Sequence, residues 1–321
     1  MLKTVRQKPW QKTQLWGLYK TQDGLDYSQS MAWLKQGKKS SAHSVTLVII
    51  YNHYFPQNIE RLQNLYSNRF SSLVHVMPFA TKEAKSWSNV IPVFESSHYF
   101  SGFVAQVSHE LPRSNIYLFV ADDALLNPAV SEKNITEFLG LKSGNFIPVL
   151  RGLGARSFWP WANGASKWSP HAPGLEVAAL LPSKDDAISA FEKHGLTGYL
   201  DVPASVLEKA PIDDYRITLD FPLATSWSDV FVVNEESLEE FSRLCGIFAS
   251  TKLFVEVAIP TAMVLSCQEI QTSASSPYKP RAVWTPEEKK QLEGFRSPHE
   301  LFESLPTDTF CIHPVKVSRW V

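Results

Sequence analysis

One segment constrains the fold of this chain more than any other: a run of apolar, β-prone residues that ends in two adjacent carboxylates. The run covers residues 115–121, and Asp122 and Asp123 follow it directly. Such a run is typical of a strand buried on both faces of a parallel sheet. Two neighbouring carboxylates repel each other and lose hydration when they are buried together. A divalent cation would remove both penalties, because Mg²⁺ and Mn²⁺ prefer hard oxygen ligands.

The residues before this strand alternate between strand and helix patterns. Apolar runs predict three earlier strands, at residues 45–51, 72–78 and 90–94. Apolar residues at helical spacing predict helices between them, at residues 58–66 and about 102–111. The alternation predicts an α/β fold with a Rossmann-type, mostly parallel central sheet flanked by helices in a single large domain.

The second half of the chain has weaker patterns. We expect strands at residues 146–150, about 175–181 and 227–233. We expect helices at about residues 132–139, from Ser183 onward, at residues 235–244 and near residues 285–288. Residues 1–43 are expected to form an N-terminal extension to a domain that covers residues 44–321.

Polar residues stand where three of the predicted strands end. They are the pairs Tyr51-Asn52 and Asp122-Asp123 and the segment of residues 95–97, which includes Ser97. The carboxyl ends of parallel strands meet at one edge of a sheet, and ligands of such sheets bind there. The sequence therefore predicts a binding site at this edge.

Composition excludes several classes of function. The 321 residues include 31 Lys and Arg against 32 Asp and Glu, so no excess of positive charge points to a nucleic-acid partner. Three scattered cysteines favour a reducing compartment over a disulfide framework. No signal peptide or apolar run of about 20 residues is evident, so we expect a cytoplasmic protein without a transmembrane segment. Peripheral contact with a membrane is compatible with this composition.

Tryptophan is abundant and partly clustered. Of the 10 tryptophans, Trp159, Trp161 and Trp168 lie close together in a segment that also contains prolines. Two interpretations stay open, a rigid packed loop or an aromatic platform on which a sugar ring stacks.

The acidic strand end resembles the metal-binding motif of GT-A glycosyltransferases, most closely in its exostosin-like form. These enzymes use nucleotide sugars and have a single α/β domain, and their usual motif is Asp-x-Asp or a run of three acids. The resemblance implies that Asp123 binds Mn²⁺ or Mg²⁺ and that Asp122 shares the ion or reaches the ribose. Ala121 stands where a first Asp is common. The resemblance also implies a nucleotide-binding half at about residues 44–152 and an acceptor half at about 153–321.

Residues late in the chain match the same plan. His313 is in the place of a third metal ligand, and Lys316 and Arg319 resemble a basic tail that closes over the diphosphate. Glu256 resembles the carboxylate at the head of a helix beneath the acceptor, and Asp229 competes with it for the role of catalytic base.

Each of these residues has a plainer interpretation. Asp122 and Asp123 could cap the next helix, His313 could be a satisfied core histidine, and Lys316 and Arg319 could be solvated surface charges. Glu256 could form a structural ion pair with Arg243 or Lys252, and Asp229 could merely hydrogen-bond a loop. Tyr51 and Asn52 could stack on and hydrogen-bond a nucleotide base, or could end a strand and start a turn.

The sequence favours a metal-assisted glycosyltransferase that uses a nucleotide-sugar donor and a glycan or glycolipid acceptor. The main alternative is a catalytically inactive GT-A-like protein that binds a glycan or a partner, and Ala121 is its motivation. A nucleotidyltransferase ranks last, because residues 51–55 contain none of the glycines of its phosphate-binding loop. The donor sugar, the base and the stereochemical course stay open.

Overall fold

The computed structural model describes residues 43–79, 87–93, 101–155, 177–203, 216–292 and 294–319, with residues 165 and 168–171 between them. Contacts within the chain group residues Ser41–Val321 into one unit, apart from Met1–Ser40. All the elements named below belong to the unit Ser41–Val321.

A five-stranded sheet forms the centre of the unit. Its strands, in order across the sheet, are β10 (Val230–Asn234), β4 (Ser114–Ala121), β1 (His43–Ile50), β2 (Ser72–Pro78) and β3 (Val90–Val93). Strands β1 to β4 run parallel to their neighbours, and β10 is antiparallel to β4. The predicted α/β class with a mostly parallel central sheet is therefore confirmed.

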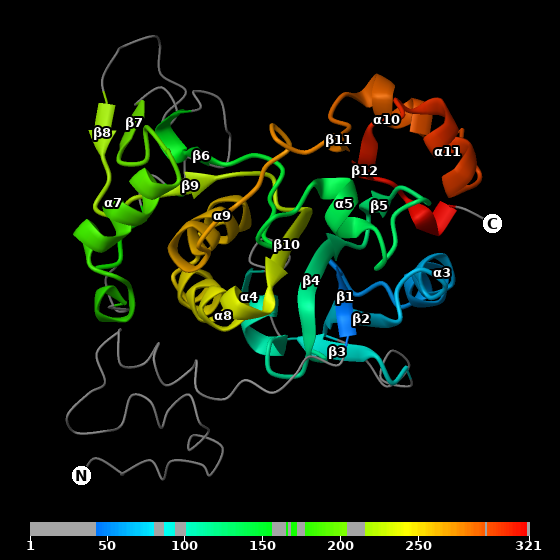
Figure 1. The fold of residues 1–321 in the computed structure, drawn as a ribbon, viewed down its shortest axis with the longest axis horizontal. Helices are drawn as coiled ribbons and strands as arrows, with labels where there is room; N and C mark the ends of the chain where they lie inside the picture. Colours follow the sequence, from blue (N-terminus) through cyan, green and yellow to red (C-terminus); the bar gives the residue numbers. More distant parts are fainter. Residues whose placement is uncertain are drawn as a thin grey trace, which may run out of the picture. The chain divides into compact units, whose positions relative to one another are not determined.

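Both faces of the sheet are covered, which explains why its strands are apolar throughout (Figure 1). In β1, Val48 and Ile50 join the core that contains α4 (Ser101–Val107), α8 (Glu235–Ser250) and α9 (Val255–Ser266). Leu47 and Ile49 point to the opposite face and pack with α3 (Gln57–Tyr66) and α5 (Ile135–Leu139). This alternation follows from the two-residue period of a strand.

A smaller sheet brings the end of the chain to the end of β4. Its order is β11 (Lys279–Ala282), β12 (Thr309–His313) and β5 (Leu125–Leu126). Strand β5 follows shortly after the acid pair, and its Leu125 lies opposite Ile312 of β12. The next residue of β12, His313, is thereby held beside the acid pair.

The remaining elements are short. Two two-stranded sheets pair β6 (Arg151–Gly152) with β9 (Ala224–Thr225) and β7 (Asp201–Pro203) with β8 (Arg216–Thr218). The remaining helices are α7 (Lys184–Lys193), α10 (Pro286–Leu292) and α11 (Pro298–Ser304), and 3-10 turns cover Leu153–Ala155, Ala178–Leu180 and Val317–Arg319. Among the described residues, no helix combines the length and the apolar character needed to cross a bilayer.

Two of the predicted strands are wrong. Residues 146–150 form no strand: Phe146 makes only isolated bridges, to Val232 and Gln271, and Pro148 has no N–H to donate to a ladder. In the segment 175–181, the described residues form a 3-10 turn, Ala178–Leu180. Apolar composition favours a strand in both cases, but in residues 146–150 pairing with β10 is limited to Phe146, and the described part of the other segment enters a turn.

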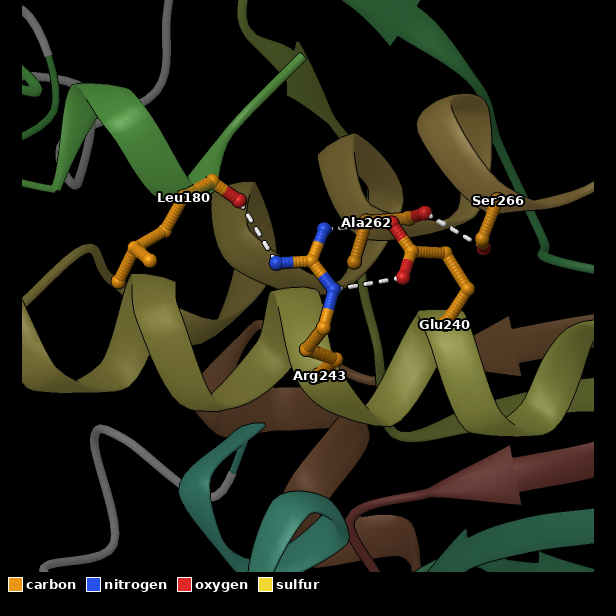
Figure 2. A network of polar contacts seen from close by, with 5 residues as sticks. All are labelled: Leu180, Glu240, Arg243, Ala262 and Ser266. Atoms are coloured by element: carbon orange, nitrogen blue, oxygen red, sulfur yellow. Dashed lines mark hydrogen bonds and ion pairs between the residues drawn. The ribbon is translucent and has the colours of Figure 1, made fainter. Parts of the chain in front are cut away.

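A buried ion pair on α8 fixes the helix against the turn that precedes α7 (Figure 2). Arg243 donates from Nε and Nη2 to the two carboxylate oxygens of Glu240, at 2.6 and 2.7 Å, and from Nη1 to the carbonyl oxygen of Leu180 at 2.7 Å. The Glu240 side chain is only 3% exposed. A carboxylate so deeply buried depends on this guanidinium for compensation.

Candidate functional site at the carboxyl ends of the strands

The acid pair begins where the hydrogen bonds of β4 end. The N–H of Ala121 donates to the carbonyl of Asp229 at 2.8 Å, and the N–H of Asp122 donates to the carbonyl of Ile50 at 2.8 Å. The neighbouring segments of chain, before β10 and at the end of β1, thus hold the backbone of the pair in place. Ala121 itself is buried in the core, so it offers the site only backbone.

Asp122 faces β1 and the start of α3. Its buried carboxylate accepts from the Asn52 N–H at 3.3 Å and from Asn58 Nδ2 at 3.5 Å. Burial, strengthened by the charge of Asp123, raises the pKa of Asp122 to about 7. Sequence reasoning does not select Asn58, because a polar residue in the first turn after a strand-end loop is its only local signal.

Asp123 faces the opposite way, toward His313 and Asp229. His313 Nε2 lies 3.2 Å from Asp123 Oδ1 and 3.4 Å from Asp229 Oδ1. The contact between Asp123 and His313 is an ion pair when the imidazole is protonated. A backbone hydrogen bond also ties the chain after β12 to the acid pair, because the N–H of Val315 donates to the carbonyl of Asp123 at 2.7 Å.

The carboxylates around His313 determine its charge. Burial by itself would lower the pKa of this histidine, but the carboxylates of Asp123, Asp229 and Glu256 outweigh it and raise the pKa to about 9. Burial, with a smaller effect of Asp123, raises the pKa of Asp229, although the positive charge of His313 opposes the shift. Without another cation, the imidazolium is the group that balances this negative charge.

Glu256 lies in the first turn of α9, at the head of a helix as the resemblance implies. It is buried, and its carbonyl accepts from the N–H of Ser226, which ties the helix to the segment before Asp229. Its charge also contributes, after those of Asp229 and Asp123, to the raised pKa of His313. Arg243, one of the two ion-pair partners expected for Glu256, forms its ion pair with Glu240.

The predicted role of Tyr51 in stacking on a base is wrong. Its side chain is fully buried beneath the edge of the sheet, and its hydroxyl shares a 2.9 Å hydrogen bond with His75 Nδ1. A ring enclosed in this way has no free face for a ligand. Asn52 ends the strand beside it, and its backbone N–H supports Asp122.

The other predicted residues are placed as follows. Lys316 is exposed and follows Val315 in the segment bound to Asp123. Arg319 ends the last 3-10 turn, but its side chain lies outside the described residues, as does Ser97. Trp168 is buried and packs edge-on against core phenylalanines, so it is no platform for a ligand; Trp159 and Trp161 lie outside the described residues.

The side chains of Asp123, Asp229 and His313 carry the kinds of ligand atom that bind a divalent metal ion. Three buried atoms of the cluster have no hydrogen-bond partner, namely Asp123 Oδ1, Asp229 Oδ2 and His313 Nδ1. Carboxylate oxygens with one imidazole suit Mn²⁺ or Mg²⁺. Within the described part of the chain, no three His, Cys, Asp or Glu side chains form a finished ligand set, so a metal would draw on side chains that now contact one another.

Comparison with known proteins adds little to this geometry. No protein-family model and no curated protein matches the sequence. Among solved structures, the apo structure of the WbbM bifunctional glycosyltransferase covers 86% of this chain and 46% of its own, at 10% identity and a TM-score of 0.36. The mannosyltransferase Ktr4p from S. cerevisiae covers 80% of this chain and 81% of its own, at 10% identity and a TM-score of 0.37. This chain thus spans less than half the length of WbbM. TM-scores this low support no inference about function.

Proposed function

We propose that this protein is a GT-A-like glycosyltransferase that moves a sugar from a nucleotide-diphosphate sugar to a hydroxyl of a glycan or glycolipid acceptor, with the assistance of Mn²⁺ or Mg²⁺. One observation supports this most: strand β12 sets His313 within 3.4 Å of both Asp123 and Asp229, at the carboxyl edge of the sheet. The resemblance to GT-A glycosyltransferases, which often carry a late histidine as a metal ligand, agrees with His313 at this place.

The two acids of the pair are proposed to have different roles. Asp123 and His313 would hold the metal, which supplies a Lewis acid for the diphosphate. Asp122 faces Asn52 and Asn58 and would bind the ribose or share the ion. Lys316 and Arg319 would neutralise the charge that develops on the leaving diphosphate.

The acceptor proton needs a base if the reaction inverts the anomeric centre. Asp229 lies 3.4 Å from His313, a position that suits a further ligand of the proposed metal ion. Glu256 is then the better base, because it lies at the head of α9 and its backbone binds the segment just before Asp229. In this step the acceptor oxygen bonds to the anomeric carbon, the bond from that carbon to the diphosphate breaks, and the hydroxyl proton passes to the Glu256 carboxylate.

A screen of nucleotide sugars tests the proposal. UDP-glucose, UDP-galactose, UDP-N-acetylglucosamine and GDP-mannose would each be incubated with the protein, with Mn²⁺ or with EDTA, and release of the nucleotide measured. We expect turnover of at least one donor, lost with EDTA and in Asp123→Asn. Asp185→Asn, which changes an exposed acid on α7, is the matched control and should retain turnover. Turnover that persists unchanged in Asp123→Asn would contradict the metal role.

A catalytically inactive GT-A-like binding protein is the second candidate. Two observations favour it: Ala121 contributes no carboxylate, and a protonated His313 balances Asp123 and Asp229 without a metal. Such a protein would bind a glycan or a partner at the same edge. Binding of glycans without turnover of any donor would favour this candidate.

A further inference from the structure

We propose that Trp284 is a platform for the acceptor, and that its indole stacks on the acceptor sugar whose hydroxyl reacts beside His313, Asp229 and Glu256. The inference depends on the proposed glycosyl transfer and adds to it the residue that positions the acceptor. It also narrows the acceptor to a molecule with a sugar ring at the reacting end.

Trp284 presents a large apolar ring to solvent. The residue is 57% exposed, and among the described residues only Phe79, at 59%, is another large apolar residue so exposed. A single exposed apolar residue needs no explanation by itself. Its position beside a cluster of four ionisable groups is what distinguishes Trp284.

The backbone around Trp284 is held in place from both sides. On one side, the N–H of Val283 donates to the carbonyl of His313 at 2.7 Å. On the other, the N–H of Trp284 donates to Glu288 Oε2 at 3.2 Å, and Glu288 also closes a reciprocal cap with Thr285 at the start of α10. The Cα of Trp284 is thereby held at a fixed place beside His313.

The indole lies next to the imidazole of His313. The two ring centroids are 6.5 Å apart, and the ring planes are inclined by 74°. The imidazole Nε2 is in turn 3.4 Å from Asp229. A sugar whose hydroxyl reacts beside His313 would therefore have its ring within reach of the indole. Sugar rings present apolar C–H faces, which aromatic rings bury well.

The position relative to the acid pair favours the acceptor over the nucleotide base. Asn52 and Asn58 donate to Asp122, the residue proposed to bind the ribose of the donor. Trp284 is instead next to the histidine that contacts Asp123 and Asp229. The nucleoside of the donor would then lie on the side of Asp122, and the acceptor sugar would approach the metal site from the side of Trp284.

The test compares transfer to a sugar with transfer to water. Trp284→Ala and Trp284→Phe would be assayed for hydrolysis of the active donor and for transfer to the methyl glycosides of glucose, galactose, mannose and N-acetylglucosamine. Phe keeps an aromatic face, so it separates stacking from other roles. In Trp284→Ala we expect a rise of about three- to tenfold in the KM for the acceptor, a smaller effect on donor hydrolysis and partial rescue in Trp284→Phe. Thermal unfolding would show that both variants are folded.

Two results would overturn the inference. An unchanged acceptor KM in Trp284→Ala would exclude stacking, and a parallel loss of donor hydrolysis would show that the indole supports His313 instead. If the wild-type protein turned over no donor, the proposed function would fail by itself. Saturation-transfer NMR with the same methyl glycosides then tests Trp284 directly: a weaker transfer signal in Trp284→Ala than in the wild type supports the platform, and equal signals from both proteins refute it.

Discussion

His75, the buried histidine beneath the edge of the sheet, allows a quantitative test of the packing under the candidate site. His75 has no exposed surface, and both ring nitrogens have partners, the Tyr51 hydroxyl at 2.9 Å and Gln63 Oε1 at 3.2 Å. These partners suit a neutral ring that accepts from Tyr51 and donates to Gln63. Burial lowers the pKa of His75 from 6.5 to about 4, so the folded protein resists a proton that the unfolded chain takes up.

The sign and size of the effect on stability follow from this lowered pKa. Between pH 6.5 and about 4 the unfolded chain binds more protons at His75 than the folded protein does, so the free energy of unfolding rises with pH in this window. The difference between a pKa of 6.5 and one of about 4 corresponds to about 3 kcal/mol, which is lost as the pH falls from 6.5 through 4. Above pH 6.5 His75 contributes no slope.

Urea unfolding at several pH values measures this slope. His75→Gln should remove it, while other titrating groups contribute equally to both proteins and cancel in the difference. His109→Gln replaces a histidine whose side chain is 71% exposed, and it should leave the pH dependence as it is in the wild type. If wild type and His75→Gln lost stability in parallel on acidification, the buried neutral histidine would be refuted.

Two further predictions concern the proposed base and the buried ion pair. Glu256→Gln should lower the rate of transfer to an acceptor by about 10² to 10⁴ while donor binding is retained, as measured by kcat and by calorimetry with the nucleotide; an unchanged kcat would exclude Glu256 as the base. Arg243→Met should destabilise the protein by about 3–5 kcal/mol in urea unfolding, because Glu240 is left buried without its cation, and the double variant Arg243→Met/Glu240→Leu should recover most of that loss. A single variant as stable as the wild type would show that the pair does not compensate Glu240.

The parts of the fold that can be predicted are those that depend on local patterns. Strands β1, β2 and β4 are buried on both faces, so their apolar runs are plain in the sequence. The direction of β10 is not evident, because an antiparallel edge strand has the same composition as a parallel one. The prediction of a strand at residues 146–150 is wrong because pairing with β10 stops after Phe146, and Pro148 lacks the N–H that a ladder needs.

The candidate site shows the same division. Features set by neighbouring residues can be predicted, and contacts between distant segments of the chain cannot. The acid pair at the end of a strand is evident from neighbouring residues, and the resemblance singles out His313. The contact between His313 and Asp229 depends on two strands that lie far apart in the chain, β10 and β12. A strand-end tyrosine such as Tyr51 gives no sign of whether its ring turns into the core. The acidic motif does not point to Trp284. Its place directly before a helix cap is a sequence signal by which it could be selected.

A metal-held diphosphate at the end of β4 can be detected by calorimetric titration with UDP and GDP, in Mn²⁺ and in EDTA. We predict that one of the two nucleotides binds to the wild-type protein with Mn²⁺, and that Asp123→Asn weakens this binding by at least about tenfold, or about 1.4 kcal/mol. EDTA should weaken it to a similar degree. Absence of binding for both nucleotides, or equal binding by wild type and Asp123→Asn, would contradict the proposed site.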